Sequence, residues 1–157
     1  MTAETRTDMT TSSTSSTGSA SSTDLGAVEV GQTLPERTLP ITRAMLVAYA
    51  GASLDRNPIH WDERFATGVG LPDIIAHGML TMGSAVQVVV DWCGDAGRVV
   101  EYSTKFVAPV VVPHDTGAEV VLGGVVKKVE DGRATVEISA TCEGKKVLGR
   151  ALAVVRL

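Results

Sequence analysis

Aromatic residues, cysteine and long apolar runs are all scarce in this chain, and each shortage narrows what the protein can be. Phenylalanine, tryptophan and tyrosine make up 4% of the 157 residues, so the core must be built from aliphatic side chains, above all valine. The two cysteines, Cys93 and Cys142, have neither a CxxC spacing nor a metal-ligand pattern, which indicates reduced thiols in a cytoplasmic protein. No apolar stretch reaches the roughly 18 residues of a membrane span, and none follows the N-terminus as in a signal peptide.

Basic residues are also in the minority. The chain has 14 Lys and Arg against 18 Asp and Glu, and it lacks a basic stripe with interleaved aromatic residues, which argues against nucleic acid as a partner. The overall composition, 44% hydrophobic and 20% charged, is typical of a soluble globular domain with a sizeable core.

The N-terminal segment differs in composition from the rest. Fifteen of the first 24 residues are Ser or Thr, and such a segment buries too little apolar surface to offset the entropy lost on ordering. We therefore expect a disordered tail over residues 1–24 and one folded domain over residues 25–157. A start codon further downstream, at Met9 or later, is an alternative explanation of this tail.

Residues 30–51 predict an edge strand followed by a helix. Pro35 lies within the strand-like stretch, and proline confines a strand to a sheet edge or a bulge. Thr42 is an N-cap residue in front of an apolar-periodic stretch that Gly51 ends. The buried stripe of this helix is expected at the i, i+3 and i+4 positions, which are Met45, Ala48 and Tyr49.

A loop over residues 52–61 and a short helix capped by Asp62 come next, before a long helix over residues 77–92. Apolar side chains go most of the way round the long helix, a pattern typical of a helix that is buried on all sides. We expect the rest of the chain to cover it.

Beyond the long helix the hydrophobic period changes to two. The alternation predicts antiparallel strands, and Asp131-Gly132 is a strong hairpin signal between two of them. Their expected ranges are 100–106, 117–129, 134–142 and 146–156. Helices early and strands late indicate the α+β class. The pattern is in outline a single hot-dog domain, in which a curved antiparallel sheet wraps around the long central helix and the loop over residues 52–61 overhangs it.

Asp55 and His60 are the candidate catalytic residues, five positions apart in the overhanging loop. Pro58 fixes its own φ angle and pushes Asn57 into an extended conformation, so the loop can hold a carboxylate and an imidazole at a set separation. Adding water across a double bond conjugated to a carbonyl needs one group that accepts a proton and another that donates one. A carboxylate and a histidine can fill both roles near neutral pH.

Gly78 is the candidate oxyanion donor, because it lies at the start of the long helix. Backbone N–H groups in the first turn of a helix have no partner inside it and lie at the positive end of its dipole. A glycine there leaves room for a carbonyl oxygen, although close packing alone also calls for glycine.

The chain resembles the MaoC-like, or (R)-specific enoyl hydratase, family in two segments, Asp55-x-Asn57-Pro58-Ile59-His60 and Ala76-His77-Gly78-Met79. The resemblance extends over nearly all of residues 28–157. Ala76 to Gly83 and Glu101-Tyr102 are similar in particular to the B subunits of actinobacterial (3R)-hydroxyacyl-acyl-carrier-protein dehydratases. One departure is Leu54, where some relatives carry glycine before the aspartate.

The resemblance implies a lyase of fatty-acid metabolism, in particular the dehydratase step of type II synthesis, with no metal and no redox cofactor. Asp55 and His60 then activate water and move the proton at the α-carbon, while the Gly78 amide polarises the thioester carbonyl. Asn57 braces the loop, and His77 supports the site from the start of the helix.

The resemblance also implies the partners. The substrates of the family are acyl thioesters of acyl carrier protein or coenzyme A, and both carriers are acidic. The candidate basic residues to contact such a carrier are Lys127, Lys128, Lys145 and Lys146. A single hot-dog layer leaves an open sheet edge, so a homodimer or a heterodimer with a second hot-dog subunit is expected.

Three alternatives stay open. The first is an acyl thioesterase on the same fold, and the second is a non-catalytic subunit of a heterodimeric dehydratase, against which the retention of both Asp55 and His60 speaks. The third is a metal site formed by two histidines and one carboxylate, namely His60, His77 and Asp55.

Overall fold

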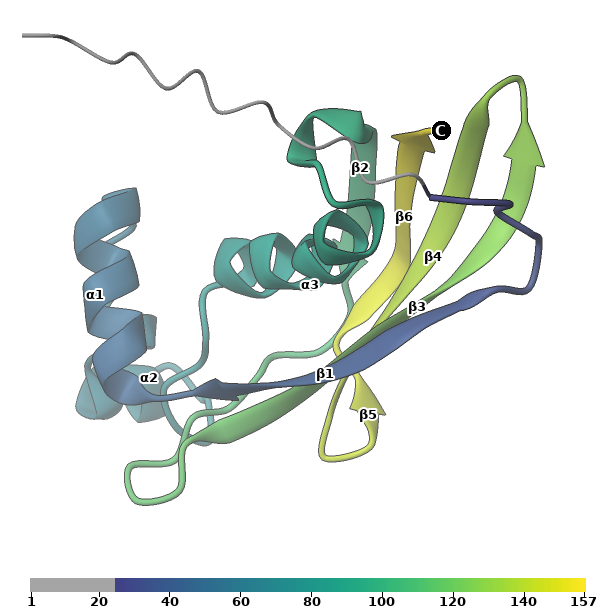
Figure 1. Ribbon diagram of the computed structural model, residues 1–157. Helices are drawn as coiled ribbons and strands as arrows, with labels where there is room; N and C mark the ends of the chain where they lie inside the picture. The colour runs from purple at the N-terminus through teal and green to yellow at the C-terminus, as the bar shows by residue number, and fades with distance from the viewer. Residues whose placement is uncertain (1–24) are drawn as a thin grey trace, which may run out of the picture.

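The long helix α3 (Gly78–Cys93) lies in the concave side of a curved antiparallel sheet, as Figure 1 shows. The computed structural model describes residues 25–157, so the tail expected over residues 1–24 lies outside the described residues. Two further helices, α1 (Arg43–Ser53) and α2 (Glu63–Gly68), lie beyond the N-terminal end of α3. No helix in the described part of the chain is both long and apolar enough to cross a membrane.

The sheet contains six strands. They are β1 (Thr33–Ile41), β2 (Val99–Phe106), β3 (Ala118–Glu130), β4 (Arg133–Cys142), β5 (Lys145–Lys146) and β6 (Leu148–Arg156). The order across the sheet is β1-β3-β4-β6-β2, and the short β5 pairs with β4. β1 and β2 therefore form the two edges, and the register of β1 shifts next to Pro35, as the edge or bulge prediction requires.

A tight turn links β3 to β4 as the sequence indicates. Asp131 and Gly132 both have positive φ angles, 48° and 68°, which is the conformation of a type I′ hairpin. The last predicted strand is instead divided in two at Val147. Its N–H donates to the Ala140 carbonyl at 2.9 Å while its carbonyl accepts from the Val107 N–H at 3.0 Å, so the chain changes neighbours at that residue.

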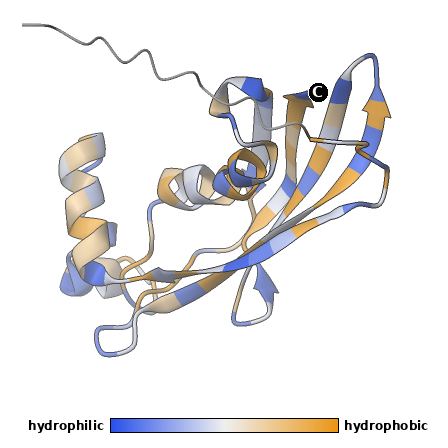
Figure 2. Ribbon diagram, viewed as in Figure 1, coloured by the Kyte–Doolittle hydropathy of each residue, from blue (hydrophilic) through white to orange (hydrophobic). Residues whose placement is uncertain are grey.

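Apolar residues alternate with polar ones along β4, as the colours of Figure 2 show. The inward set packs on one face of α3, and the buried residues of that helix are Thr81, Ala85, Val88, Val89 and Cys93. The opposite face is open, and Met79 is 59% exposed. The prediction of a helix buried on all sides is therefore wrong for the single chain, because one sheet can cover only one side.

The buried stripe of α1 also differs from the prediction. Leu46 and Ala50 are buried, whereas Ala48 is exposed. The N-cap is as predicted, since the Thr42 side chain accepts from the Met45 N–H at 3.2 Å. The helix runs on past Gly51 to Ser53, and Leu54 closes it in the left-handed conformation.

Candidate active site

Asp55 and His60 face each other after the end of α1. The distance from His60 Nε2 to the nearer carboxylate oxygen, Asp55 Oδ2, is 3.9 Å. His60 is buried, whereas the Asp55 side chain is 52% exposed. The gap is too long for a direct hydrogen bond, but it allows one small oxygen-bearing group to contact both side chains.

Local hydrogen bonds in the loop set the position of the carboxylate. Asp55 Oδ1 accepts from the Asn57 N–H at 3.3 Å, which leaves Oδ2 on the side of His60. Asn57 Oδ1 in turn accepts from the Ile59 N–H at 3.2 Å and caps the short 3-10 helix Pro58–His60. These contacts are consistent with the bracing role that the resemblance implies for Asn57, and that role stays a prediction.

The imidazole of His60 is fixed by the backbone of a distant segment. Its Nδ1 lies 2.7 Å from the carbonyl oxygen of Ile75. A carbonyl can only accept a hydrogen bond, so Nδ1 carries the proton. In the neutral ring Nε2 is then the unprotonated nitrogen, and it is the one that faces Asp55.

His77 contacts both members of this pair. Its Nε2 donates to the backbone carbonyl of Asp55 at 3.1 Å, and its ring stacks on that of His60 with centroids 3.8 Å apart. Burial lowers the pKa of His77, and the neighbouring His60 lowers it further, against the opposing effect of the bond to Asp55. Its Nδ1 is buried and has no hydrogen-bond partner among residues 25–157.

Gly78 is the first residue of α3 and shares a cavity with His60. The cavity has a volume of about 360 Å³, and its other walls are largely apolar, including Phe106, Val110 and Leu148. Within the described residues the Gly78 N–H has no acceptor. A Cβ at this position would lie 3.1 Å from the Phe106 ring, so the glycine also permits close packing.

Asp55, His60 and His77 are close enough to suggest a metal site, with one ligand atom of each within 4.8 Å of the others. The stacking of the two rings argues against it. The interplanar angle is 25°, so an ion about 2.1 Å from a nitrogen of one ring, in the plane of that ring, would lie well outside the plane of the other. The two imidazoles cannot both bind one ion in this arrangement.

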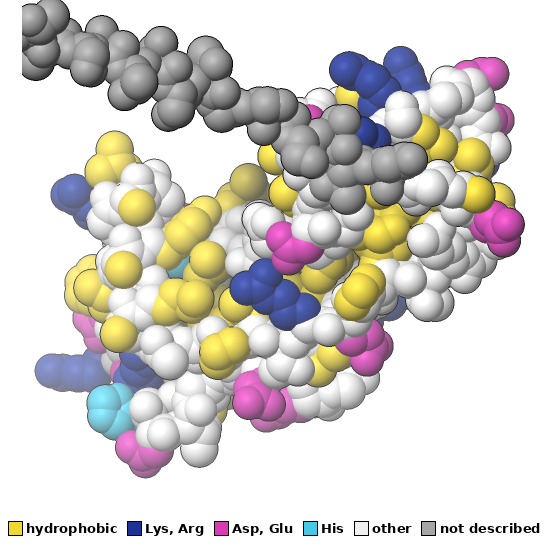
Figure 3. Space-filling view, viewed as in Figure 1, with side chains coloured by type: hydrophobic (Ala, Val, Ile, Leu, Met, Phe, Trp, Pro, Cys, Tyr) yellow, Lys and Arg dark blue, Asp and Glu magenta, His cyan; other side chains and the backbone are white. Residues whose placement is uncertain are grey.

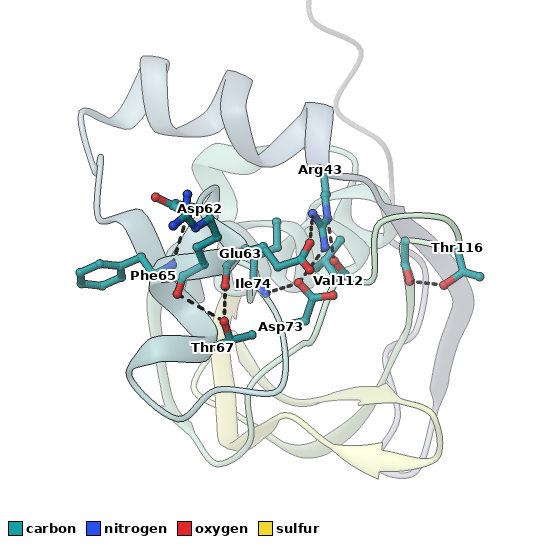
Figure 4. Close-up of polar contacts among 11 residues, drawn as sticks. Arg43, Asp62, Glu63, Phe65, Thr67, Asp73, Ile74, Val112 and Thr116 are labelled. Atoms are coloured by element: carbon teal, nitrogen blue, oxygen red, sulfur yellow. Dashed lines mark hydrogen bonds and ion pairs between the residues drawn. The ribbon is translucent and has the colours of Figure 1, made fainter.

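Sequence reasoning missed a polar cluster around Arg43, which Figure 4 shows. The Arg43 guanidinium donates to Glu63 Oε2 at 2.8 Å, to Asp73 Oδ1 at 2.7 Å and to the Val112 carbonyl at 3.2 Å. A signal was available, because an arginine in the first turn of a helix lies at the unfavourable positive end of the dipole and calls for compensating carboxylates.

The predicted basic residues for an acidic carrier are partly neutralised. Lys127 pairs with Glu137 at 3.4 Å, and Lys128 pairs with Glu130. Lys145 and Lys146 form the short β5 and are exposed.

The chain is similar to proteins that are named hydratases or dehydratases of acyl thioesters. Residues 27–144 match the family model described as "MaoC like domain". The (R)-specific enoyl-CoA hydratase of Rhodospirillum rubrum is 33% identical over 109 residues, which cover 69% of this chain and 74% of that protein. The solved structure of a MaoC-like dehydratase is similar with a TM-score of 0.82 and 41% identity, over 85% of this chain and 42% of that one.

A third relative is the 3-hydroxyacyl-thioester dehydratase X of Mycobacterium tuberculosis, 37% identical over 89 residues. The match covers 57% of this chain but only 31% of that protein, so the chain spans less than half the length of this relative. The solved neighbours have the curved sheet and central helix seen here, and the hot-dog fold expected from the sequence is confirmed.

Proposed function

The chain belongs to the MaoC-like domain family, and we propose that it is a hydro-lyase that reversibly hydrates trans-2-enoyl thioesters or dehydrates (3R)-hydroxyacyl thioesters. The observation that carries the proposal is the pairing of an exposed carboxylate with a buried imidazole at 3.9 Å, on a cavity that His60 shares with the Gly78 amide. We further propose that fatty-acid synthesis is the setting.

The proposed reaction uses both sides of this gap. In the direction of hydration, a water molecule held between Asp55 Oδ2 and His60 Nε2 gives up a proton as its oxygen bonds to C3. The Asp55–His60 pair accepts this proton and delivers a proton to C2, so that the elements of water add across the double bond and the pair returns to its starting protonation state. Dehydration runs the same steps in reverse. Two groups that exchange protons near neutral pH typically contribute about 10²–10⁴-fold each to such a rate.

The Gly78 N–H is the proposed donor to the thioester oxygen. Negative charge develops on the thioester oxygen when C3 is attacked, and a backbone N–H at a helix N-terminus can stabilise it. The Gly78 N–H lacks an acceptor within the described residues, and the cavity gives a carbonyl access to it. Asn57 and His77 support this arrangement by holding the loop and the Asp55 carbonyl.

The proposal is tested by mixing the purified protein with trans-2-enoyl-CoA and following the loss of the enoyl-thioester absorbance. Asp55→Asn and His60→Gln should each lower kcat by about 10³-fold or more, whereas His114→Gln, an exposed loop histidine, should not. The product should be the (3R)-hydroxyacyl thioester, without release of free thiol.

Other outcomes of this assay are equally informative. Release of free thiol would identify a thioesterase instead. An inactive protein is tested again with acyl carrier protein thioesters and with candidate hot-dog partner subunits. Activity of those mixtures that survives both substitutions would identify a non-catalytic subunit, and inactivity throughout would overturn the enzyme assignment.

We also infer that the chain pairs with a second hot-dog subunit, its own copy or another chain, through the edge strand β2. The opposite edge, β1, carries Pro35 and Pro40, which cannot donate to a new strand. β2 has no proline, and Val100 and Phe106 are 41% and 54% exposed. Light scattering should give a dimer, alone or with the partner chain, and Ser103→Pro should dissociate it. A fully active monomer contradicts this inference.

A further inference from the structure

One guanidinium joins the three segments that carry the proposed site. Arg43 is the first residue of α1, whose far end leads into Asp55. Glu63 is the first residue of α2, which follows His60, and Asp73 precedes the segment that ends at Gly78. Arg43 pairs with both of these carboxylates, so segments 20 and 30 positions along the chain are tied to the start of α1.

We propose that Arg43, together with Asp73, is a positioning residue that sets the orientation of His60 and keeps it aligned with Asp55 and the Gly78 amide. This inference rests on the proposed function for its catalytic consequence, but its structural consequence can be measured independently. Neither residue lines the cavity, so both act through their neighbours.

A short chain of contacts connects Arg43 to the imidazole. Asp73 Oδ1 accepts from Arg43 at 2.7 Å and also from the Ile74 N–H at 2.6 Å. The next carbonyl along the chain, that of Ile75, accepts the Nδ1 proton of His60. The position of the Asp73 carboxylate therefore fixes the backbone on which the tautomer of His60 depends.

A second path holds the same backbone from the other side. Arg43 Nε donates to the carbonyl of Val112, and the Val112 N–H donates to the carbonyl of Ile74 at 2.9 Å. Ile75 and Val111 form an isolated β-bridge between these segments. Arg43 thus holds both strands of the bridge that presents the Ile75 carbonyl to His60.

The cluster requires an arginine. Its three contacts leave the guanidinium in different directions, from Nε, Nη1 and Nη2, and a lysine ammonium on a flexible stem cannot reproduce that fork. The Arg43 and Asp73 side chains are 21% and 20% exposed, whereas Glu63 is 55% exposed. Asp73 is therefore the more important of the two carboxylates, because its pair with Arg43 is less screened by water.

The test compares Arg43→Gln, Arg43→Lys and Asp73→Asn with wild type. Arg64→Gln is the matched control, since Arg64 is exposed in α2 and its side chain has no hydrogen bond or ion pair with a described residue. We expect all three cluster variants to lose about 10²-fold in kcat with KM within about two-fold, because misplacement of a catalytic group by ~1 Å has that effect. Arg43→Lys should not restore the rate, and Arg64→Gln should match wild type.

The ¹⁵N spectrum of the imidazoles gives a readout that does not depend on activity. Wild type should show His60, assigned with His60→Gln, as the Nδ1–H tautomer with a hydrogen-bonded ring proton. In Arg43→Gln and Asp73→Asn that signal should change to a mixture of tautomers, while the thermal unfolding midpoint stays above the assay temperature.

The outcomes distinguish the positioning role of Arg43 from the proposed function. A wild type that is inactive with every thioester and partner subunit, but whose His60 signal changes in the variants, removes the proposed function and leaves the positioning role. An unchanged His60 signal, or a kcat in Arg43→Gln above half that of wild type, overturns the positioning role. A loss of kcat that disappears when the assay is cooled to where every variant is fully folded overturns it as well.

Discussion

The two halves of the domain are held together by different forces. Residues 99–156 form regular strands whose inward side chains are buried aliphatic residues. Residues 42–78 form short helices and loops tied by directional polar contacts, with Asp55 and Leu54 largely exposed. The difference indicates that the sheet half supplies most of the free energy of unfolding. The site half contains local conformations that lower this free energy but hold the functional groups in place.

The site half shows local conformations that cost free energy. Leu54 has a φ angle of 62°, a left-handed conformation that costs a non-glycine residue about 1–2 kcal/mol. His77 has a buried nitrogen without a partner among the described residues. Such features persist at sites where the surrounding structure fixes them. Hydrophobic side chains also lie exposed on α1 and α3, on the face shown in Figure 3.

The comparison of the two halves predicts that a substitution in the core of the sheet lowers the free energy of unfolding but leaves kcat unchanged. Leu122→Ala, in β3, should reduce the free energy of unfolding by about 3 kcal/mol, because Leu122 is 1% exposed and its loss leaves a cavity. Urea unfolding measures this, and kcat of the folded fraction should stay near wild type. Val121→Ala, on the outer face of the same strand, is the control and should cost less than about 1 kcal/mol.

The converse holds for Gly78→Ala, which should lower kcat by about 10- to 100-fold while changing the free energy of unfolding by less than about 1 kcal/mol. The added methyl group would crowd the carbonyl oxygen and press on the Phe106 ring. Gly83→Ala is the matched control in the same helix, because a Cβ there meets no atom within 4 Å. Wild-type kinetics of Gly78→Ala would remove the proposed oxyanion role.

A smaller effect is expected where the sheet half contacts α3. The Tyr102 hydroxyl of β2 donates to the Met82 carbonyl of α3 at 3.1 Å, and burial raises the pKa of Tyr102 to about 12. Tyr102→Phe should therefore cost about 1 kcal/mol of stability at neutral pH. Spectrophotometric titration should find Tyr102 still protonated above pH 10, and ionisation near the ordinary value would contradict the buried hydrogen bond.

The smallest effect is a pH dependence of stability from His77. Burial lowers its pKa below the unfolded value of about 6.5, so the unfolded chain binds the proton more tightly. The contribution of His77 to stability is therefore complete above about pH 6.5 and is lost as pH falls through its lower folded pKa. Urea unfolding between pH 8 and pH 5 should show a shallower decline for His77→Gln than for wild type. Equal declines contradict the prediction.

Short-range patterns predicted the elements well. Thr42 and Asp62 cap their helices, Asp131-Gly132 forms its hairpin, and the period of two gives the strands of the sheet. Each of these depends on residues within a few positions of one another. The catalytic roles of Asp55 and His60 also came from a local motif, and they stay predictions until activity is measured.

Long-range contacts are where sequence reasoning failed. The stripe of α1 was placed one position away from Leu46, and Val147 was not seen to break the last strand, because both depend on which neighbour the chain packs against.

The sequence by itself determined the fold class, the helix caps, the main hairpin and the chemical identity of the candidate site, because turn chemistry and hydrophobic period act between near neighbours. Only the tertiary structure decided that His77 stacks on His60, that Ile75 fixes the His60 tautomer and that Arg43 meets Asp73 across 30 positions. These contacts join segments 15 to 30 positions apart in the sequence, so no local pattern encodes them.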